Sequence, residues 1–203
     1  ITYYKQKNEG FASARNKALE LAKSDWIAII DHDDICMPNR LENQYNEIRL
    51  NPDCYLFFGD TIHIDSRGDK ITNQYTRYNP VHLDLTASNA GKNLLKHGCF
   101  IDTESVVFNR LKALEIKGFN TRYKFIVDYD FFIRFGFKYG IYASKNIISK
   151  WRIHEDQATN YMSSLEIKEL NYIYLKYIKS NVIPINIKII LILKKIKFYI
   201  KLL

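Results

Sequence analysis

Unbroken runs of apolar residues mark the first strands that the sequence predicts. Trp26–Ile30 (WIAII) and Cys54–Phe58 (CYLFF) are continuous apolar runs, and Ile1–Lys5 (ITYYK) is a short aromatic and β-branched run. A short continuous run is typical of a strand buried on both faces, as in a parallel sheet. We therefore predict strands at these three positions, with Trp26–Ile30 and Cys54–Phe58 buried.

Helical periodicity separates these runs. Between Phe11 and Ser24, apolar residues recur three, four and seven positions apart, which places them on one face of a helix. A second helix is predicted to start near Pro38, which the first turn tolerates, and to stop at Asn51-Pro52. Strands and helices thus alternate, which favours an α/β fold with a mostly parallel sheet flanked by helices.

The middle of the chain is less regular. Thr61–Asp65 and Lys70–Tyr75 flank a turn at Ser66–Asp69 and predict a small antiparallel hairpin. Residues 76–98 show weak periodicity, so we expect a loop with a short helix around Leu94–His97. Further along, the pattern predicts strands at Glu104–Asn109 and Tyr139–Ser144 and helices at Arg110–Lys117 and Asp128–Phe137.

Residues 161–203 form a basic helical tail, which we separate from a main domain at residues 1–160. Apolar residues gather on one face of its last helix and lysines on another, a pattern typical of an amphipathic helix at a membrane surface. The lysines interrupt the pattern too often for a membrane span. A helix docked on the protein's own domain would show the same pattern. The apolar face comprises Ile189, Ile192, Leu193, Ile196, Ile200 and Leu203, and the lysines are Lys194, Lys197 and Lys201.

Composition narrows the class of protein. The 203 residues are 47% hydrophobic and 14% aromatic, which argues against a disordered chain. The formal net charge is +8, but eight lysines and two glutamates in residues 161–203 supply +6 of it. A nucleic-acid-binding face over the main domain is therefore disfavoured. Cys36, Cys54 and Cys99 form no CxxC pair, and we expect reduced thiols in a cytoplasmic protein.

Three carboxylates directly follow the Trp26–Ile30 run. Because desolvating a carboxylate is unfavourable, we expect the strand to end here and to present Asp31, Asp33 and Asp34 at its carboxyl end, where open α/β sheets bind ligands. A hard divalent cation relieves repulsion among such acids and takes further ligands from phosphates. The residues alone leave two interpretations open: a metal–diphosphate site on Asp31 and Asp33, or a strand-end turn with an aspartate capping the next helix.

Five stretches in order resemble the family-2 glycosyltransferases of the GT-A fold. Each stretch alone is a weak signal, whereas five in the same order, over roughly residues 1–160, are fairly specific. The stretches are Asn8-Glu9-Gly10 with Ala14-Arg15-Asn16, Trp26–Asp34 with Pro38 and Leu41, His97–Asn109, Gly118-Phe119 with Asp128-Tyr129-Asp130 and Arg134, and Trp151-Arg152-Ile153-His154.

The chain departs from the family pattern at two points. The family's first strand, and a second strand whose aspartate grips uracil and ribose, would precede Ile1, so we expect the sequence to lack them. The resemblance places Ile1–Lys5 as the third strand and Trp26–Ile30 beside the missing first strand. Val127 stands where the family has a glutamate before the aspartate at position 128, so no role for that glutamate is implied here.

The resemblance implies an inverting transfer of a sugar from a nucleotide-diphosphate sugar, such as a UDP-sugar, to a hydroxyl of a glycan or lipid-linked acceptor. The implied pathway is surface polysaccharide synthesis, with Mn²⁺ or Mg²⁺ neutralising the leaving diphosphate. We expect a cytoplasmic protein without a nucleic-acid partner, held at the inner face of the plasma membrane by its tail. The donor sugar, the acceptor and the linkage do not follow from the fold.

The resemblance also implies roles for the acidic residues. Asp33 is expected to bind the metal ion, and Asp31 the metal or the ribose. Asp34 is expected to cap the next helix, because it precedes the turn at Pro38. Asp128 is expected to be the general base, although a carboxylate at a helix N-terminus is also stabilised by the helix dipole.

The remaining candidate residues each have a plainer explanation. His154 is a further candidate metal ligand, and a lone histidine is about as often structural. Asp130 and Arg134 are expected on the acceptor side, but they lie four residues apart on one helix and could simply pair. The nucleotide-sugar site is expected to include Asn8, Gly10, Arg15, Asn16, Asp31 and Asp33.

Two other function classes fit parts of the pattern. A nucleotidyltransferase can use a similar sheet and acidic metal site. Such an enzyme would be expected to carry a Gly-rich, basic phosphate loop near its first strand, a region that we expect this sequence to lack. A non-catalytic module that binds sugar nucleotides would need the metal site and no base at Asp128. The base therefore separates a transferase from a binding module.

Overall fold

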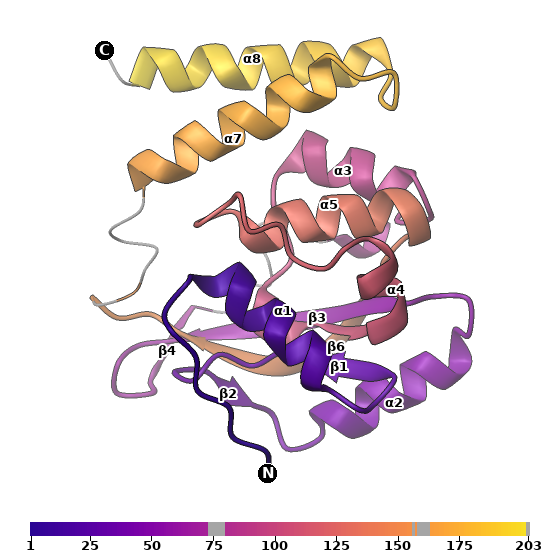
Figure 1. The fold of residues 1–203 in the computed structure, drawn as a ribbon, viewed down its shortest axis with the longest axis vertical. Coiled ribbons are helices and arrows are strands. Elements are labelled where there is room, and N and C mark those ends of the chain that lie inside the picture. The colour runs from indigo at the N-terminus through magenta and orange to yellow at the C-terminus, as the bar shows by residue number, and fades with distance from the viewer. Residues whose placement is uncertain (73–79, 156, 158–162, 202–203) are drawn as a thin grey trace.

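The computed structural model describes residues 1–72, 80–155, 157 and 163–201, and these residues form one mixed sheet with helices on both sides (Figure 1). The helices are α1 Phe11–Leu21, α2 Arg40–Leu50, α3 Asn89–His97, α4 Arg110–Glu115, α5 Val127–Tyr139, α7 Ser163–Ile178 and α8 Ile185–Lys201, with 3-10 turns η1 Pro80–His82 and η2 Thr103–Ser105. The strands are β1 Trp26–Ala28, β2 Ile35–Cys36, β3 Leu56–Ile64, β4 Lys70–Thr72, β5 Val107–Asn109 and β6 Tyr142–Arg152.

The sheet has the strand order β1-β5-β3-β6-β2, with β4 added to β3. The α/β class is confirmed, but among the described strands only β3 and β6 pair in parallel. The other pairs are antiparallel. The long connection that contains α3, α4 and α5 lets β6 return parallel to β3, since a parallel pair needs a crossover. The sequence pattern of buried strands therefore overestimated the parallel share.

The N-terminal strands differ most from the prediction. Ile1–Lys5 is not a strand, and residues 1–10 have no regular secondary structure, with Tyr3 84% exposed. The predicted strand at Trp26–Ile30 is shorter, because only Trp26–Ala28 pairs with β5. Within the described residues β1 lies at the edge of the sheet and pairs antiparallel, so it is not the central, doubly buried strand that its apolar run suggested.

Two elements are longer than predicted. β6 runs for 11 residues instead of ending at Ser144, and its polar residues hid the strand from the apolar pattern. α3 covers nine residues of a stretch expected to be mostly loop. Gly91 weakens its helical signal, but a Cβ there would lie 2.5 Å from the Phe137 ring of α5. A residue without a Cβ is therefore needed at position 91 for α3 and α5 to pack this closely. The hairpin is formed by β3 and β4, and residues 73–75 of its predicted second strand lie outside the described residues.

An aromatic cluster fixes α5 against the sheet. Phe119 and Phe131 stack with ring centroids 4.3 Å apart, and Phe108 of β5 lies 5.1 Å from Phe131. All three side chains are buried. Aromatic pairs in this range add packing energy beyond their buried area. The N-terminal end of α5 is therefore held close to the end of the sheet where the acidic motif lies.

The tail helices α7 and α8 form the outermost layer, beyond α3 and α5 (Figure 1). In α8 the docked face contains the buried residues Ile187 and Leu191, and Lys194 Nζ donates a hydrogen bond to the Leu95 carbonyl of α3 at 3.1 Å. The helix is therefore docked on its own domain. The predicted apolar face is a different one, and four of its residues stay in solvent: Ile189, Ile192, Leu193 and Ile196 are 44–59% exposed. Leu203 and the side chain of Ile200, which the prediction also placed on this face, lie outside the described part of the chain.

Candidate functional site

A cleft of about 550 Å³ opens beside the end of β1. It is lined by five carboxylates from four separate parts of the chain: Asp31, Asp102 with Glu104, Asp128, and Glu166 of α7. Its apolar walls come from the N-terminal turn of α5 and from α7, which contributes Leu170 and Tyr174. The cleft thus brings together the acidic strand end and the helix expected to carry the base.

Arg15 joins two of these carboxylates. Its guanidinium forms an ion pair with Asp128 Oδ1, and its other terminal nitrogen lies 3.5 Å from Asp31 Oδ1. Burial alone would lower the pKa of Arg15, but the charges of Asp128 and Asp31 outweigh it and raise that pKa above its ordinary value. The guanidinium also lies 5.6 Å from the centre of the Phe119 ring. Three residues predicted from separate motifs are therefore brought into one cluster.

Asp33 and His154 form a second cluster. His154 Nε2 lies 3.1 Å from Asp33 Oδ2, and both side chains remain about one-quarter exposed. Burial works to raise the pKa of Asp33, but the hydrogen bond with His154 and other favourable contacts leave it below its ordinary value. An ionised carboxylate beside an imidazole is a donor set that divalent metals accept.

Arg152 holds this second cluster in place. Its Nε donates to the Asp33 carbonyl at 3.0 Å, and its backbone N–H donates to Asp34 Oδ1 at 2.9 Å. A terminal nitrogen donates to the carbonyls of Asp65 and Ser66 in the β3–β4 turn, each at 3.1 Å. Because Arg152 ends β6, it fastens the loop of Asp33 to the strand that leads directly to His154.

The prediction that Asp34 caps the next helix is wrong. Asn39 occupies the N-cap position of α2, and the Asp34 carboxylate accepts the Arg152 N–H instead. Burial is the main cause that raises the pKa of Asp34 to about 6, and the nearby charges of Asp33 and Asp31 add to it. Strand β2 and the turn after it separate Asp34 from α2, which the sequence pattern did not show.

The donor set fits a metal ion only in part. Within the described residues, no group of three or more His, Cys, Asp or Glu side chains is placed to hold one. Asp33 and His154 supply two donors, whereas Asp31 faces Arg15. Mg²⁺ is commonly bound by one or two carboxylates, with phosphate and water oxygens completing its shell. The pair therefore suits a cation shared with a diphosphate rather than a complete protein cage.

Two predicted nucleotide-binding residues have local structural partners. The Asn16 amide donates to the Phe119 carbonyl at 2.8 Å and accepts the Phe119 N–H at 2.7 Å. Asn8 Oδ1 accepts the N–H of Gly10 at 3.1 Å, and Gly10 has a φ of 89° just before α1. Asn16 thus uses its amide to join α1 to the loop before α5, and Asn8 shapes the turn that starts α1.

Asp130 and Arg134 pair with each other, as the plainer interpretation held. Arg134 Nε lies 2.6 Å from Asp130 Oδ2, and the guanidinium also donates to the carbonyls of Ile116 and Gly118. Asp130 is 1% exposed, and neither residue lines the cleft. The pair therefore anchors α5 to the loop after α4.

Several buried polar residues of the site region were not predicted. Glu104 is 4% exposed, and burial raises its pKa well above the ordinary value. Arg40 of α2 is buried and donates to the carbonyls of Ile29 and Val106, at 2.8 and 3.0 Å. Glu169 of α7 accepts three backbone N–H groups before α5. Nothing local in the sequence distinguishes these residues from exposed charges on a helix.

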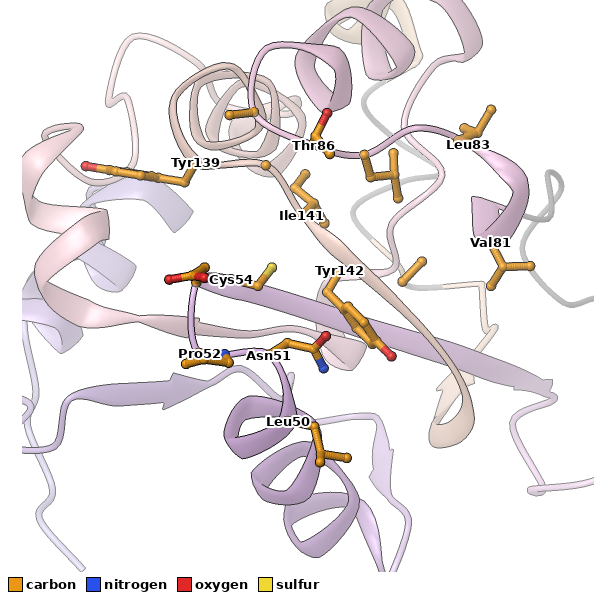
Figure 2. A pocket seen from close by; sticks show the side chains of 15 residues that line it. Leu50, Asn51, Pro52, Cys54, Val81, Leu83, Thr86, Tyr139, Ile141 and Tyr142 are labelled. Atoms are coloured by element: carbon orange, nitrogen blue, oxygen red, sulfur yellow. The ribbon is translucent and has the colours of Figure 1, made fainter.

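A second cavity lies away from the acidic cleft. It has a volume of about 660 Å³ and lies where the parallel strands β3 and β6 begin (Figure 2). Asp53 is the one Asp, Glu, Lys or Arg among the described residues that line it. Much of the wall is apolar and comes from Leu50, Val81, Leu83 and Ile141. Ligands of α/β sheets bind at the opposite, carboxyl ends of strands. The acidic cleft is therefore the candidate site.

Comparison with known proteins decides the family. The model for "Glycosyl transferase family 2" matches residues 1–116, more than half of the chain. The chain belongs to glycosyl transferase family 2. The resemblance inferred from the five motifs is thereby confirmed. Asp33 and Arg15 lie inside the matched residues, whereas Asp128, His154 and Glu169 lie beyond them.

Relatives of the family-2 chain include an uncharacterised glycosyltransferase of Rickettsia typhi, 27% identical over 79% of this chain and 49% of the relative. The amylovoran biosynthesis glycosyltransferase AmsE of Erwinia amylovora is 27% identical over 64% of this chain and 45% of AmsE. The chain spans about half the length of these curated relatives. These similarities support membership of a glycosyltransferase family.

The fold of this family-2 chain is similar to that of S. aureus TarS. The crystal structure of TarS residues 1–349 in complex with UDP-GlcNAc superposes with a TM-score of 0.63, over 95% of this chain and 54% of the TarS chain, at 12% identity. A TarS structure of the same residues gives a TM-score of 0.62. The comparison confirms the predicted GT-A type of α/β fold.

Proposed function

We propose that this chain carries the catalytic centre of an inverting glycosyltransferase that uses a nucleotide-diphosphate sugar. The observation that carries the proposal is the bridge of Arg15 between Asp31 and Asp128, because it joins the acidic strand end to the helix expected to carry the base. A UDP-sugar is the donor class we favour, since the similar TarS binds UDP-GlcNAc. The similarity to AmsE supports surface polysaccharide synthesis, with a glycan or lipid-linked hydroxyl as acceptor.

The donor diphosphate is assigned to the side of the cleft near Asp33. Asp33 and His154 would hold Mn²⁺ or Mg²⁺, which when bound neutralises the charge that develops on the leaving diphosphate. Arg152 keeps the loop of Asp33 in position through its carbonyl. The Asp31 side chain, about half exposed, is free to accept from a ribose hydroxyl while Arg15 balances its charge.

Asp128 is assigned as the general base. Its carboxylate takes the proton of the acceptor hydroxyl as the hydroxyl oxygen forms a bond to the anomeric carbon. The bond between that carbon and the diphosphate oxygen breaks on the opposite face, so the configuration inverts. Arg15 contacts Oδ1 of Asp128, and the side chain keeps 24% of its surface exposed at the cleft. The ion pair fixes the orientation of the base before the acceptor arrives.

A donor screen tests the proposed function. UDP release would be measured for a panel of UDP- and dTDP-sugars with Mn²⁺, Mg²⁺ or EDTA, with and without glycan and lipid-linked acceptors. We expect release with one UDP-sugar, dependent on acceptor and on a divalent cation. Binding of UDP without transfer to any acceptor would instead support a non-catalytic module. Pyrophosphate release from a nucleoside triphosphate and a sugar phosphate would support a nucleotidyltransferase.

A membrane surface is the proposed partner of α8. The structure of α8 leaves a row of exposed apolar side chains, which includes Ile189, Leu193 and Ile196, after its other face has docked on α3 and α7. None of the helices in the described ranges has both the length and the apolar character needed to cross a bilayer. Such a face suits the interface of an anionic bilayer, where lysines beside it add attraction.

Charge placed on this face is expected to release the protein from membranes. We predict that Ile189→Glu/Leu193→Glu lowers binding to vesicles of phosphatidylcholine and phosphatidylserine ~10-fold or more, because it removes apolar insertion and adds repulsion. Co-sedimentation measures the bound fraction. Leu111→Glu, at a 50% exposed apolar position of α4, is the matched control. Equal binding by the wild type and the double variant would show that α8 does not contact the membrane.

A further inference from the structure

Glu169 is the residue of α7 that contacts the turn leading into α5. Its Oε1 accepts the backbone N–H of Lys124 at 2.8 Å. Its Oε2 accepts the N–H groups of Phe125 and Ile126, each at 3.0 Å. Glu169 is buried, with 8% of its surface exposed. One buried carboxylate thus satisfies three successive backbone donors from a segment more than 40 positions earlier in the chain.

This arrangement defines the start of α5. Ile126 is the N-cap residue of α5, and Asp128 is the second residue of the helix. The N-cap side chain makes no hydrogen bond of its own, and Glu169 accepts the backbone N–H of this N-cap residue and of the two residues before it. Hydrogen bonds from backbone N–H groups to an ionised carboxylate are among the stronger ones in proteins. A negative charge near the N-terminus of a helix also interacts favourably with the helix dipole.

Asp128 is consequently held from two sides. Arg15 of α1 contacts its side chain, whereas Glu169 of α7 fixes the backbone turn two residues before it. The same helix α7 lines the cleft beside Asp128 through Leu170 and Tyr174. A shift of about 1 Å in a reacting group can lower a rate ~10²-fold, so the position of this turn matters for a base.

We propose that Glu169 is a positioning residue for Asp128, acting through the backbone N–H groups of residues 124–126. This inference rests on the proposed function, in which Asp128 is the general base. Glu169 touches neither donor nor acceptor in this assignment. It would therefore affect the rate of transfer while leaving the binding of the donor nearly unchanged.

Glu169→Gln is the variant that tests the proposal. Glutamine keeps the size of the side chain, but its NH₂ group cannot accept the two N–H groups that face Oε2. Ile173→Val is the matched control, because Ile173 is a fully buried residue one turn further along α7 that makes none of these hydrogen bonds. The control loosens the packing of α7 without touching the turn. Both variants would be made in the full chain, and Tm would be recorded for each.

The first measurement is hydrogen exchange at the amides of residues 124–126. We expect exchange ~10-fold faster or more in Glu169→Gln at the amides that lose their acceptor, and near the wild-type rate in Ile173→Val, because only the first variant removes an acceptor oxygen from this turn. The second measurement is the carbon NMR chemical shift of the Asp128 carboxyl group at one fixed pH, which reports on its surroundings. We expect this chemical shift to change in Glu169→Gln alone. Neither measurement requires a transferase reaction, so both test Glu169 even if the proposed function fails. Unchanged exchange and an unchanged chemical shift in Glu169→Gln would overturn the proposal.

The third measurement is kinetic. Glu169→Gln is expected to lower kcat ~10-fold to 10²-fold, with the donor KM within about 2-fold of the wild type. In an Asp128→Asn background the same substitution is expected to have no further effect on kcat, because the base that it positions is gone. An equal fall of kcat in both backgrounds would assign Glu169 to general stability instead. A wild type that transfers no sugar would overturn the proposed function, not the positioning of Asp128.

Discussion

Asp128→Asn is expected to lower the rate of sugar transfer ~10²-fold to 10⁴-fold, the usual loss on removal of a general base. The side chain keeps its size, but an amide cannot take the proton of the acceptor hydroxyl. Donor binding is expected to stay near the wild-type value, because Asp128 acts on the acceptor. Steady-state kinetics with a saturating UDP-sugar measure the loss, and calorimetry with UDP measures binding.

Asp128→Asn also removes one of the two carboxylate partners of Arg15, so a structural effect must be separated from a chemical one. A thermal melt checks that the variant still folds cooperatively. Asp53→Asn, a change of another carboxylate in the turn after α2 and outside the cleft, serves as the matched control and is expected to keep its turnover. Near-normal transfer by a well-folded Asp128→Asn variant would place the base on another residue.

Asp33→Asn is expected to reduce metal-dependent binding of UDP ~10²-fold, equivalent to about 2.7 kcal/mol. Asparagine can still accept from His154, but it lacks the charge that attracts a divalent cation next to a diphosphate. Calorimetry with UDP, in Mn²⁺ and in EDTA, measures the effect. In EDTA the wild type and the variant are expected to bind alike.

His32→Asn is the matched control for Asp33→Asn, because His32 is the neighbouring residue and its side chain is 98% exposed. It is expected to bind UDP as tightly as the wild type does in Mn²⁺. If Asp33→Asn retained full affinity in Mn²⁺, the cation would have to be assigned to other residues. The result would leave the role of Asp128 untouched, because the two predictions concern different substrates.

The sequence predicted which residues lie in the site better than it predicted which residues contact one another there. Asp31 and Asp33 follow an apolar run, and carboxylates at a strand end have few explanations other than a ligand or a turn. Their partners Arg15 and His154 were found from motifs in a fixed order. The sharing of Arg15 between Asp31 and Asp128 could not be predicted, because it depends on where α1 lies relative to α5.

Residues that support the site through backbone groups were missed for a physical reason. Glu169 was not named, and Arg152 was named only as part of a motif, because both act on N–H and carbonyl groups, which every residue has, so no pattern of side chains identifies the partner. Asn16 was placed at the nucleotide on its position in a helix, whereas its amide pairs with Phe119. Strand direction was misjudged for a related reason: an apolar run indicates burial, and an antiparallel strand such as β1 can share it.

The contact between Asp33 and His154 joins residues 121 positions apart, which affects when the site can appear during synthesis. Chains grow at about 5–20 residues per second, so His154 is added about 6–24 s after Asp33. β6, which carries Arg152 at its end, must also reach β3 before the loop of Asp33 is fastened. During this interval Asp33 and Asp34 are without their partners Arg152 and His154. The proposed nucleotide-sugar site is therefore complete only after β6 has been synthesised and has paired with β3.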